Sequence, residues 1–407
     1  MRVLRFAERT KGAKRSAIRE LLKYTEQPEV ISFAGGLPDP ATFPLEFLAR
    51  VAQEEILHNA VKSLQYTTTE GKRPLREALA RWLAEEGIHT TMDQIVITNG
   101  SQQGLDLLGR AFLDQGDAVF VSLPTYLGAL QAFRAYQPTL VGVPLENDGM
   151  DLEFLRRAIR EARRAGHAPK LIYVIPDFQN PTGITWSEEK RRELLEIASK
   201  EDLLVVEDIP YRWLRYRGAP LPTLASLDKE GRVIVLLTFS KILAAGLRVG
   251  ALVGPQEVAN MVVTLKQGAD LCGPSLTQRL AVRFLTEYDL NSHFAFLCQH
   301  YKVKLDAMLE ALARYMPAEA EWTKPEGGLF VWVKLPEDVD TMRMLERALQ
   351  HKVAYVPGQP FFADGSGHNT MRLSFALASL DQIEEGIRRL GEVVKEEMAA
   401  LSLAQRG

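Results

Sequence analysis

The sequence has few of the features that mark several large classes of protein. It contains only two cysteines, Cys272 and Cys298, with no C-x-x-C pair, so neither a disulfide framework nor a metal site is expected. No apolar run approaches the length of a membrane span. The 49 basic and 52 acidic residues leave a formal net charge of −3, which favours neither nucleic acid nor a membrane surface as a partner. The basic first nineteen residues lack the apolar segment of a secretion signal, so we expect a cytoplasmic protein.

What the sequence does contain is typical of a large globular protein. Its 407 residues are 46% apolar and 25% charged, which predicts two or three domains. Five apolar runs rich in β-branched residues are too short for helices: 95–98, 118–121, 171–175, 203–206 and 233–238. Between them lie segments with helical spacing, such as 102–113 and 188–200. Apolar strands that alternate with helices predict an α/β fold, with a mostly parallel sheet covered on both faces.

The last third of the chain changes character. Strand-like runs around 327–333, 353–357 and 371–375 mix with helical patterns at 301–315 and 380–398, which predicts a smaller α+β domain. We therefore predict three parts: an N-terminal segment, 1–45, that packs with the small domain; a large domain, 46–290; and a small C-terminal domain, 291–407.

Polar residues follow several of the predicted strands, at the edge where sheets of this kind bind ligands. Ser101 and Gln102 open a helix whose N-terminus could bind a phosphate, although an ordinary helix cap has the same pattern. Asn180 lies in a turn that ends at Gly183. Asp208, followed by Tyr211, is either a buried carboxylate that needs a cationic partner or an acid of a surface loop.

A lysine follows the strand at 233–238. Lys241 comes after Ser240 and precedes Arg248 by seven residues. Desolvation and nearby cations lower the pKa of a lysine, and the neutral amine can form a Schiff base, whereas a solvated lysine has no such role. An amine, a phosphate-binding helix start, a carboxylate and hydroxyl donors at one sheet edge are the groups that pyridoxal phosphate requires. The patterns G-x-G-x-x-G after the first strand and G-x-x-x-x-G-K-[ST] are both absent.

Several motifs in order then resemble a known family over almost the whole chain. The sequence is similar to the fold-type I, class I and II pyridoxal-phosphate aminotransferases, and among them to the 2-aminoadipate/kynurenine aminotransferase-like branch. The motifs are FAGGLP at 33–38, QYTTTEG at 65–71, GSQQ at 100–103, QNPTG at 179–183, ED at 207–208 with Tyr211, SK at 240–241 with GLR at 246–248, and MRLSF at 371–375.

The resemblance implies roles for the residues at these positions. Lys241 would form the Schiff base and move the proton, Asp208 would hold the ring nitrogen protonated, and Tyr211 and Asn180 would bind the ring 3-oxygen. Other residues would bind the cofactor's phosphate or its ring face: Ser101, Gln102, Tyr126, Thr238, Ser240 and Arg248.

The resemblance also implies how substrate and a second subunit would take part. Arg372 would bind the substrate α-carboxylate, and Gly36 would lie against the substrate, where no Cβ fits. Tyr66 would reach the phosphate in the other subunit of a homodimer. Arg19 would receive a side-chain carboxylate, although a solvated helix arginine is an equal interpretation. Asp177 has no assigned role.

The implied activity is transfer of an amino group from an L-amino acid to 2-oxoglutarate. The donors would include 2-aminoadipate and glutamate, and aromatic or branched-chain amino acids. A pyridoxal-phosphate lyase or decarboxylase shares the same cofactor-binding residues and is the alternative. A ligand-sensing domain of a transcription regulator is a third hypothesis, but the resemblance to the family begins at SAIRELL, residues 16–22, before a helix-turn-helix domain could fit.

Overall fold

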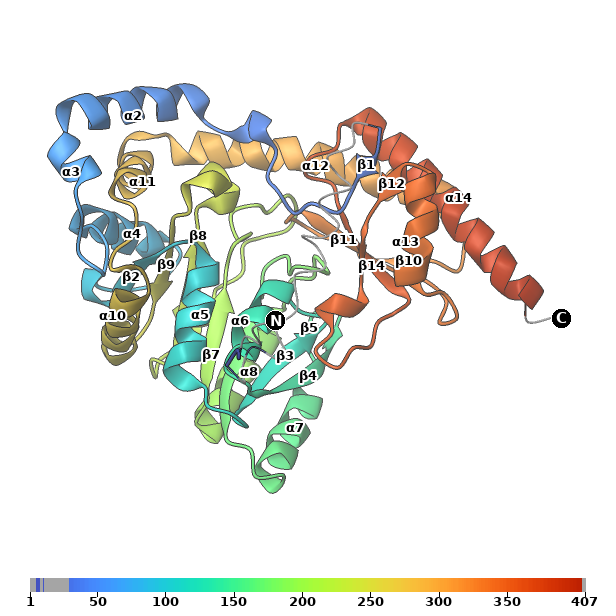
Figure 1. The fold of residues 1–407 in the computed structure, drawn as a ribbon, viewed down its shortest axis with the longest axis horizontal. Coiled ribbons are helices and arrows are strands. Elements are labelled where there is room, and N and C mark those ends of the chain that lie inside the picture. Colours follow the sequence, from blue (N-terminus) through green and yellow to red (C-terminus); the bar gives the residue numbers. More distant parts are fainter. Residues whose placement is uncertain (1–4, 8–9, 11–28, 405–407) are drawn as a thin grey trace.

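The computed structural model describes residues 5–7, 10 and 29–404 (Figure 1). Arg19 lies outside the described residues. Within the described part of the chain, no helix is both long and apolar enough to cross a membrane.

An eight-stranded sheet forms the centre of the larger part of the molecule, in the order β2-β9-β8-β7-β6-β3-β4-β5. The strands are β2 (Ile95–Thr98), β3 (Ala118–Leu123), β4 (Thr139–Glu146), β5 (Gly149–Met150), β6 (Pro169–Val174), β7 (Leu204–Asp208), β8 (Val233–Thr238) and β9 (Gly250–Val253). Only β9 and β5 run antiparallel to their neighbours. The predicted α/β fold with a mostly parallel sheet is confirmed.

The five predicted strands are all present, with ends shifted by at most two residues. Three further strands, β4, β9 and the two-residue β5, were not expected. β4 contains Gly142 and Pro144 and is only partly buried, so it lacks an apolar run. β9 has four residues and begins with Gly250, where a Cβ would lie 2.7 Å from the carbonyl oxygen of Leu237.

Helices surround this sheet (Figure 1). They are α4 (Arg73–Glu85), α5 (Ser101–Phe112), α6 (Leu127–Arg134), α7 (Leu152–Arg164), α8 (Glu188–Glu201), α9 (Leu224–Leu227), α10 (Gln256–Asp270) and α11 (Ser275–Glu287). Every residue of β2, β8 and β9 is buried, as expected for strands covered on both faces. Local signals set the helix ends: the Ser187 side chain caps α8, and Asp202 ends it in the left-handed conformation.

A second sheet has the order β10-β11-β14-β13 and is antiparallel throughout. Its strands are β10 (Glu321–Trp322), β11 (Phe330–Lys334), β13 (Val356–Pro357) and β14 (Thr370–Ser374). Helices α12 (Leu290–Tyr315), α13 (Thr341–Gln350) and α14 (Leu380–Ala404) pack around it. Figure 1 shows α12 extending from the helices beside the large sheet to this smaller part.

The N-terminal part of the described chain lies against both regions. β1 (Ile31–Ser32) pairs in parallel with β12 (Val353–Ala354), and α2 (Leu45–His58) and α3 (Ala60–Leu64) contact α11. The predicted domain boundary near residue 290 coincides with the first residue of α12, and the division into domains stays a prediction.

The two sheets are joined closely where the chain passes through residues 325–330. The backbone N–H of Gly328 donates to Leu214 O at 2.9 Å, and the N–H of Tyr216 donates to Glu326 O at 2.7 Å. Glycine is required here, because a Cβ on Gly327 would overlap the carbonyl oxygen of Leu214. A Cβ on Gly183 would likewise lie 2.7 Å from the carbonyl oxygen of Phe330.

Candidate active site

The candidate site lies where the carboxyl ends of β2, β6, β7 and β8 meet. These four strands point the same way, because β9 runs antiparallel to both β2 and β8. The predicted residues after each strand are therefore brought to one edge of the sheet, which is where open α/β sheets bind their ligands.

Asp208, the last residue of β7, has a carboxylate that is only half satisfied. The side chain is 2% exposed, and Oδ2 accepts a hydrogen bond from the Tyr173 hydroxyl at 2.9 Å. The other oxygen, Oδ1, is buried without a well-formed hydrogen bond, although the nearby Ser101 hydroxyl helps to lower the pKa of the carboxyl. Burial raises the pKa of Asp208 to about 7. A buried carboxylate oxygen that faces no cation of the protein suits a positively charged ring nitrogen.

The neighbouring Glu207 is equally buried but fully satisfied. Its carboxylate accepts from the backbone N–H groups of Leu224 at 2.7 Å and Ala225 at 2.8 Å. Burial raises its pKa to about 6. Successive strand residues face opposite sides of the sheet, so Glu207 anchors α9 while Asp208 faces the site.

Lys241 lies in a π-helical turn, Ser240–Ala244, directly after β8. Its Nζ donates to the carbonyl oxygen of Gly36 at 2.7 Å. Burial and the positive charges of Arg372 and Arg248 lower the pKa of Lys241 to about 8. An appreciable share of neutral amine is therefore present near neutral pH, as a nucleophile requires.

The start of α5 forms an anion cradle with Arg248. Gly100 has φ +74°, and a Cβ there would lie 2.6 Å from Arg248 Nη2. Arg248 Nη2 donates to Asn99 O at 3.1 Å, and the buried Ser101 Oγ has no hydrogen-bond partner. An unpartnered hydroxyl, a helix N-terminus and a guanidinium suit a phosphate.

The other predicted phosphate ligands differ in how close they come to this cradle. The hydroxyls of Thr238 and Ser240 are 2.9 Å apart, and Arg248 Nη1 lies 3.5 Å from Ser240 Oγ. Gln102 instead directs its side chain to α6, where Nε2 donates to Gly128 O at 2.8 Å and Oε1 accepts from Tyr126 at 3.3 Å.

An ion pair between Lys266 and Asp270 lies next to the start of α5. Lys266 is fully buried, and its Nζ lies 2.7 Å from Asp270 Oδ1. Asp270 Oδ2 accepts from the side chains of Asn99 at 2.8 Å and Gln103 at 2.6 Å. Sequence reasoning missed this pair, because nothing in the helical pattern of α10 distinguishes Lys266 from a solvated lysine.

Arg372, on β14, lies at the side of the site formed by the smaller sheet. It is 2% exposed, and its guanidinium donates to Asn180 Oδ1 at 2.9 Å and to Ala34 O at 2.8 Å. Its Nε has no partner, and burial lowers the pKa of Arg372 to about 10. The guanidinium lies over the Phe330 ring, whose Cζ would be 2.9 Å from a Cβ on Gly36.

Tyr211 lies beside Asn180 and Phe330 in the same group of residues. It is 4% exposed, its ring meets Phe330 edge-on at 5.7 Å, and it hydrogen-bonds to Asn180. Burial raises the pKa of Tyr211, so the hydroxyl keeps its proton and can donate. Tyr66 is not part of this group: it follows α3 and is 79% exposed.

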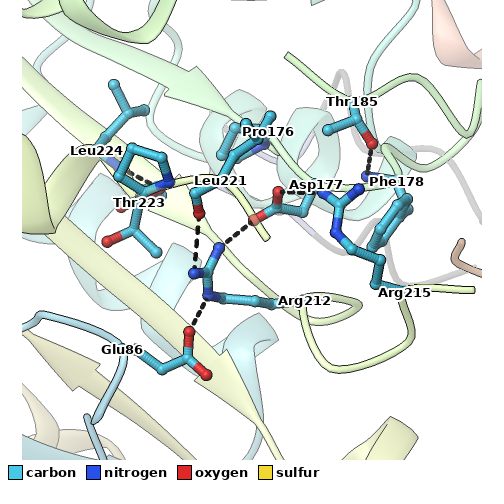
Figure 2. Close-up of polar contacts among 12 residues, drawn as sticks. Glu86, Pro176, Asp177, Phe178, Thr185, Arg212, Arg215, Leu221, Thr223 and Leu224 are labelled. Atoms are coloured by element: carbon cyan, nitrogen blue, oxygen red, sulfur yellow. Dashed lines mark hydrogen bonds and ion pairs between the residues drawn. The ribbon is translucent and has the colours of Figure 1, made fainter. Parts of the chain in front are cut away.

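Asp177 lies immediately behind the site, in a cluster of buried charges (Figure 2). Its carboxylate contacts Arg191 at 2.7 Å, Arg212 at 3.1 Å and Arg215 at 3.8 Å. These arginines lower the pKa of Asp177 although the side chain is buried. Arg212 also pairs with Glu86 at 2.6 Å. Asp177 therefore faces protein cations, whereas Asp208 faces none.

These residues fit pyridoxal phosphate in three respects that the structure itself provides. Lys241 offers an amine with a lowered pKa. Asp208 Oδ1 and Ser101 Oγ are buried and lack partners, as expected of groups that await a ring nitrogen and a phosphate. Among the described residues, no group of three or more His, Cys, Asp or Glu side chains could hold a metal.

Comparison with known proteins agrees with this chemistry. A family model described as aminotransferase class I and II matches residues 28–390. An aromatic-amino-acid aminotransferase of Thermococcus litoralis is 47% identical over 394 residues, which span 97% of this chain and 94% of that protein.

Two solved structures are also similar over nearly their whole length. A kynurenine aminotransferase of Pyrococcus horikoshii, solved with PMP, has 47% identity and a TM-score of 0.93, with 96% of this chain and 97% of that chain covered. An alpha-aminoadipate aminotransferase of Thermus thermophilus, solved with N-(5'-phosphopyridoxyl)-L-leucine, has 41% identity and a TM-score of 0.90, with 97% and 98% covered.

Proposed function

The chain belongs to the class I and II aminotransferases and uses pyridoxal phosphate, and from this premise we propose that it transfers the amino group of a broad set of L-amino acids to 2-oxoglutarate in a ping-pong reaction. The observation that carries the proposal is the unpartnered, buried Oδ1 of Asp208. That oxygen needs a cationic partner, and a protonated ring nitrogen would provide one.

The proposed cofactor ligands are the residues at the sheet edge. Lys241 would hold the cofactor covalently, Asp208 would pair with the ring nitrogen, and Tyr211 and Asn180 would bind the ring oxygen. When bound, the cofactor supplies an electron sink for the bond broken at the substrate Cα. Tyr126 would lie on the ring, and the phosphate would be bound by Ser101, Gln102, Thr238, Ser240 and Arg248.

Two side chains would act on the substrate itself. Lys241, released from the cofactor, would take the Cα proton on Nζ, and its pKa of about 8 lets the amine accept and return a proton near neutral pH. Arg372 would bind the α-carboxylate through its guanidinium, which is already oriented by Asn180 and Ala34. Gly36 leaves room for the substrate beside Phe330.

The proposed donors are aromatic amino acids, 2-aminoadipate, glutamate and branched-chain amino acids. The names of the similar proteins support the first two, and the leucine adduct in one of them supports an apolar donor. Arg19 is the proposed partner of a side-chain carboxylate. Arg19→Ala should raise KM for glutamate and 2-aminoadipate far more than for leucine or phenylalanine; equal changes in KM would contradict this role.

We also propose a homodimer in which Tyr66 binds the phosphate in the partner subunit. Tyr66 is exposed next to an apolar surface of α2 and α3, formed by Ile56, Leu57, Val61 and Leu64. An apolar surface of this kind is typical of an interface between subunits. Sedimentation of the purified protein measures the oligomeric state, and a monomer would contradict the proposal.

The visible absorption of the purified protein tests the proposed reaction. Each amino acid is added in turn, and then 2-oxoglutarate. A cofactor band that disappears with the donor and returns with the acceptor would support transamination and rank the donors. A band that never changes to the aminated form, together with an eliminated or decarboxylated product, would indicate a lyase or decarboxylase instead.

A further inference from the structure

The charge cluster around Asp177 connects the two turns that carry the proposed ligands of the ring oxygen. Asp177 lies three residues before Asn180 in one turn. Arg212 is the residue after Tyr211 in the other turn, and its Nη1 lies 3.1 Å from Asp177 Oδ2. The ion pair therefore joins the two turns close in sequence to Asn180 and Tyr211.

The cluster is anchored on several sides. Arg191 is fully buried and also donates to the backbone oxygens of Trp186 at 3.2 Å, Pro222 at 3.0 Å and Pro176 at 3.0 Å. Figure 2 shows Arg212 between Asp177, Glu86 and the carbonyl oxygen of Leu221, which it contacts at 3.0 Å. The position of the Asp177 side chain is restricted, because its arginine partners are themselves held by backbone oxygens.

Arg215 extends the cluster toward the smaller sheet. Its guanidinium lies 4.8 Å from the centre of the Phe178 ring, and Nη1 pairs with Glu326 at 2.9 Å. Glu326 belongs to the segment that leads into β11 and Phe330, which lies beneath Arg372. The cluster thus contacts the turns that carry the proposed cofactor ligands and the segment that leads to Phe330, beside the proposed substrate ligand Arg372.

We propose that Asp177 is a positioning residue for the turns that carry Asn180 and Tyr211. This inference rests on the proposed function, because it assigns Asp177 to the hydrogen bonds made to the ring oxygen of pyridoxal phosphate. Asp177 itself touches neither substrate nor cofactor. The charge of Asp177 holds Arg212, and with it the turn that carries Tyr211, against the turn that carries Asn180. The Tyr211 hydroxyl and the Asn180 amide are thereby directed to the same point.

The visible band of the bound cofactor changes with pH, and the midpoint of this change tests the proposed role of Asp177. It distinguishes positioning from a through-space effect of the charge and from a purely structural ion pair. Donors to the ring oxygen stabilise the deprotonated form of the bound chromophore, so displacement of Tyr211 and Asn180 raises the midpoint. Loss of a negative charge that acted only through space would lower the midpoint, because nearby positive charge favours deprotonation. A purely structural ion pair would leave the midpoint unchanged.

The test variant is Asp177→Asn, which keeps the shape of the side chain and removes its charge. A matched control is Glu55→Gln in α2, because Glu55 is also fully buried and pairs with Arg279 at 2.8 Å and Arg283 at 3.3 Å. Both variants should unfold more readily without cofactor. Only Asp177→Asn should raise the midpoint, by about 1 pH unit, and weaken binding of pyridoxal phosphate about 10-fold.

An unchanged or lowered midpoint in Asp177→Asn would overturn the proposal, as would an equal rise in Glu55→Gln. If Asp177→Asn does not fold, Arg215→Lys replaces it, because lysine keeps the positive charge and a rise then reports the position of the turns and not the loss of a cation. Arg215 lies at the margin of the cluster, 3.8 Å from Asp177, so a smaller rise is expected and an unchanged midpoint again overturns the inference. Absence of any visible band in the wild-type protein would instead mean that the proposed function is wrong.

Discussion

Asp177 and Asp208 are two buried aspartates on adjoining segments of the same sheet edge, and their surroundings are opposite. Asp177 faces Arg191, Arg212 and Arg215, which lower its pKa. Asp208 faces the neutral hydroxyls of Tyr173 and Ser101, and burial raises its pKa to about 7. The first is paired with cations of the protein itself, while the second has no protein cation beside it and would pair with the proposed ring nitrogen.

The difference shows how a functional carboxylate can be recognised. Burial alone does not distinguish the two aspartates, since both side chains are at most 2% exposed. The distinguishing feature is the missing partner on Asp208 Oδ1, which an apo protein tolerates at a cost in stability. Four measurements test whether the two aspartates differ in this way.

The largest expected effect is on folding. Asp177→Asn leaves three arginines facing an uncharged amide, and removal of one partner from a buried ion pair costs about 3 to 5 kcal/mol. Urea unfolding of the cofactor-free protein measures the loss. A loss below about 1 kcal/mol, the range of exposed pairs, would mean that the two aspartates do not differ in this way.

The second effect is on catalysis. Asp208→Asn should lower kcat by on the order of 10² to 10³-fold, because the ring nitrogen loses the charge that keeps it protonated. Steady-state transamination with phenylalanine and 2-oxoglutarate measures kcat for this variant. Activity within fivefold of the wild type would show that Asp208 does not pair with the ring.

The third effect is the pH dependence of stability without cofactor. The pKa of Asp208 rises from 3.8 to about 7 on folding, so its contribution is fully favourable below about pH 4 and is lost as the pH rises to about 7. Asp208→Asn should therefore stabilise the cofactor-free protein by about 1 to 3 kcal/mol at pH 8 and by much less at pH 4. Thermal unfolding at both pH values measures the difference. A variant that is less stable at pH 8 would contradict the assignment.

The smallest effect concerns the Tyr173 hydroxyl, which donates to Asp208 Oδ2. Tyr173→Phe removes that hydrogen bond, which is worth about 1 kcal/mol and corresponds to about a fivefold loss in kcat. The bond also lowers the pKa of Asp208, so its loss should raise the pKa further. The pH profile of cofactor binding should shift upward in the variant, and an unshifted profile would show that Tyr173 acts only in packing.

Sequence patterns predicted the sheet and the edge at which the site forms, because each buried strand is an apolar run that ends in polar residues. Lys241, Asp208 and Asn180 could be singled out in this way. Arg191 and Lys266 could not, since their partners, Asp177 and Asp270, become distinctive only once the segments are folded. Tyr173 resembled the other apolar residues of its strand, and its hydroxyl contacts a residue 35 positions away.

The glycines that join the two sheets also limit how the molecule can move. Backbone lies against backbone where Gly327 meets Leu214, and a Cβ on Gly183 would lie 2.7 Å from the carbonyl oxygen of Phe330. The smaller sheet therefore cannot slide across the larger one at this point, since any shift would push main-chain atoms into each other. Residues 325–328 are therefore the place where the two sheets are least free to move apart or to accept a larger side chain.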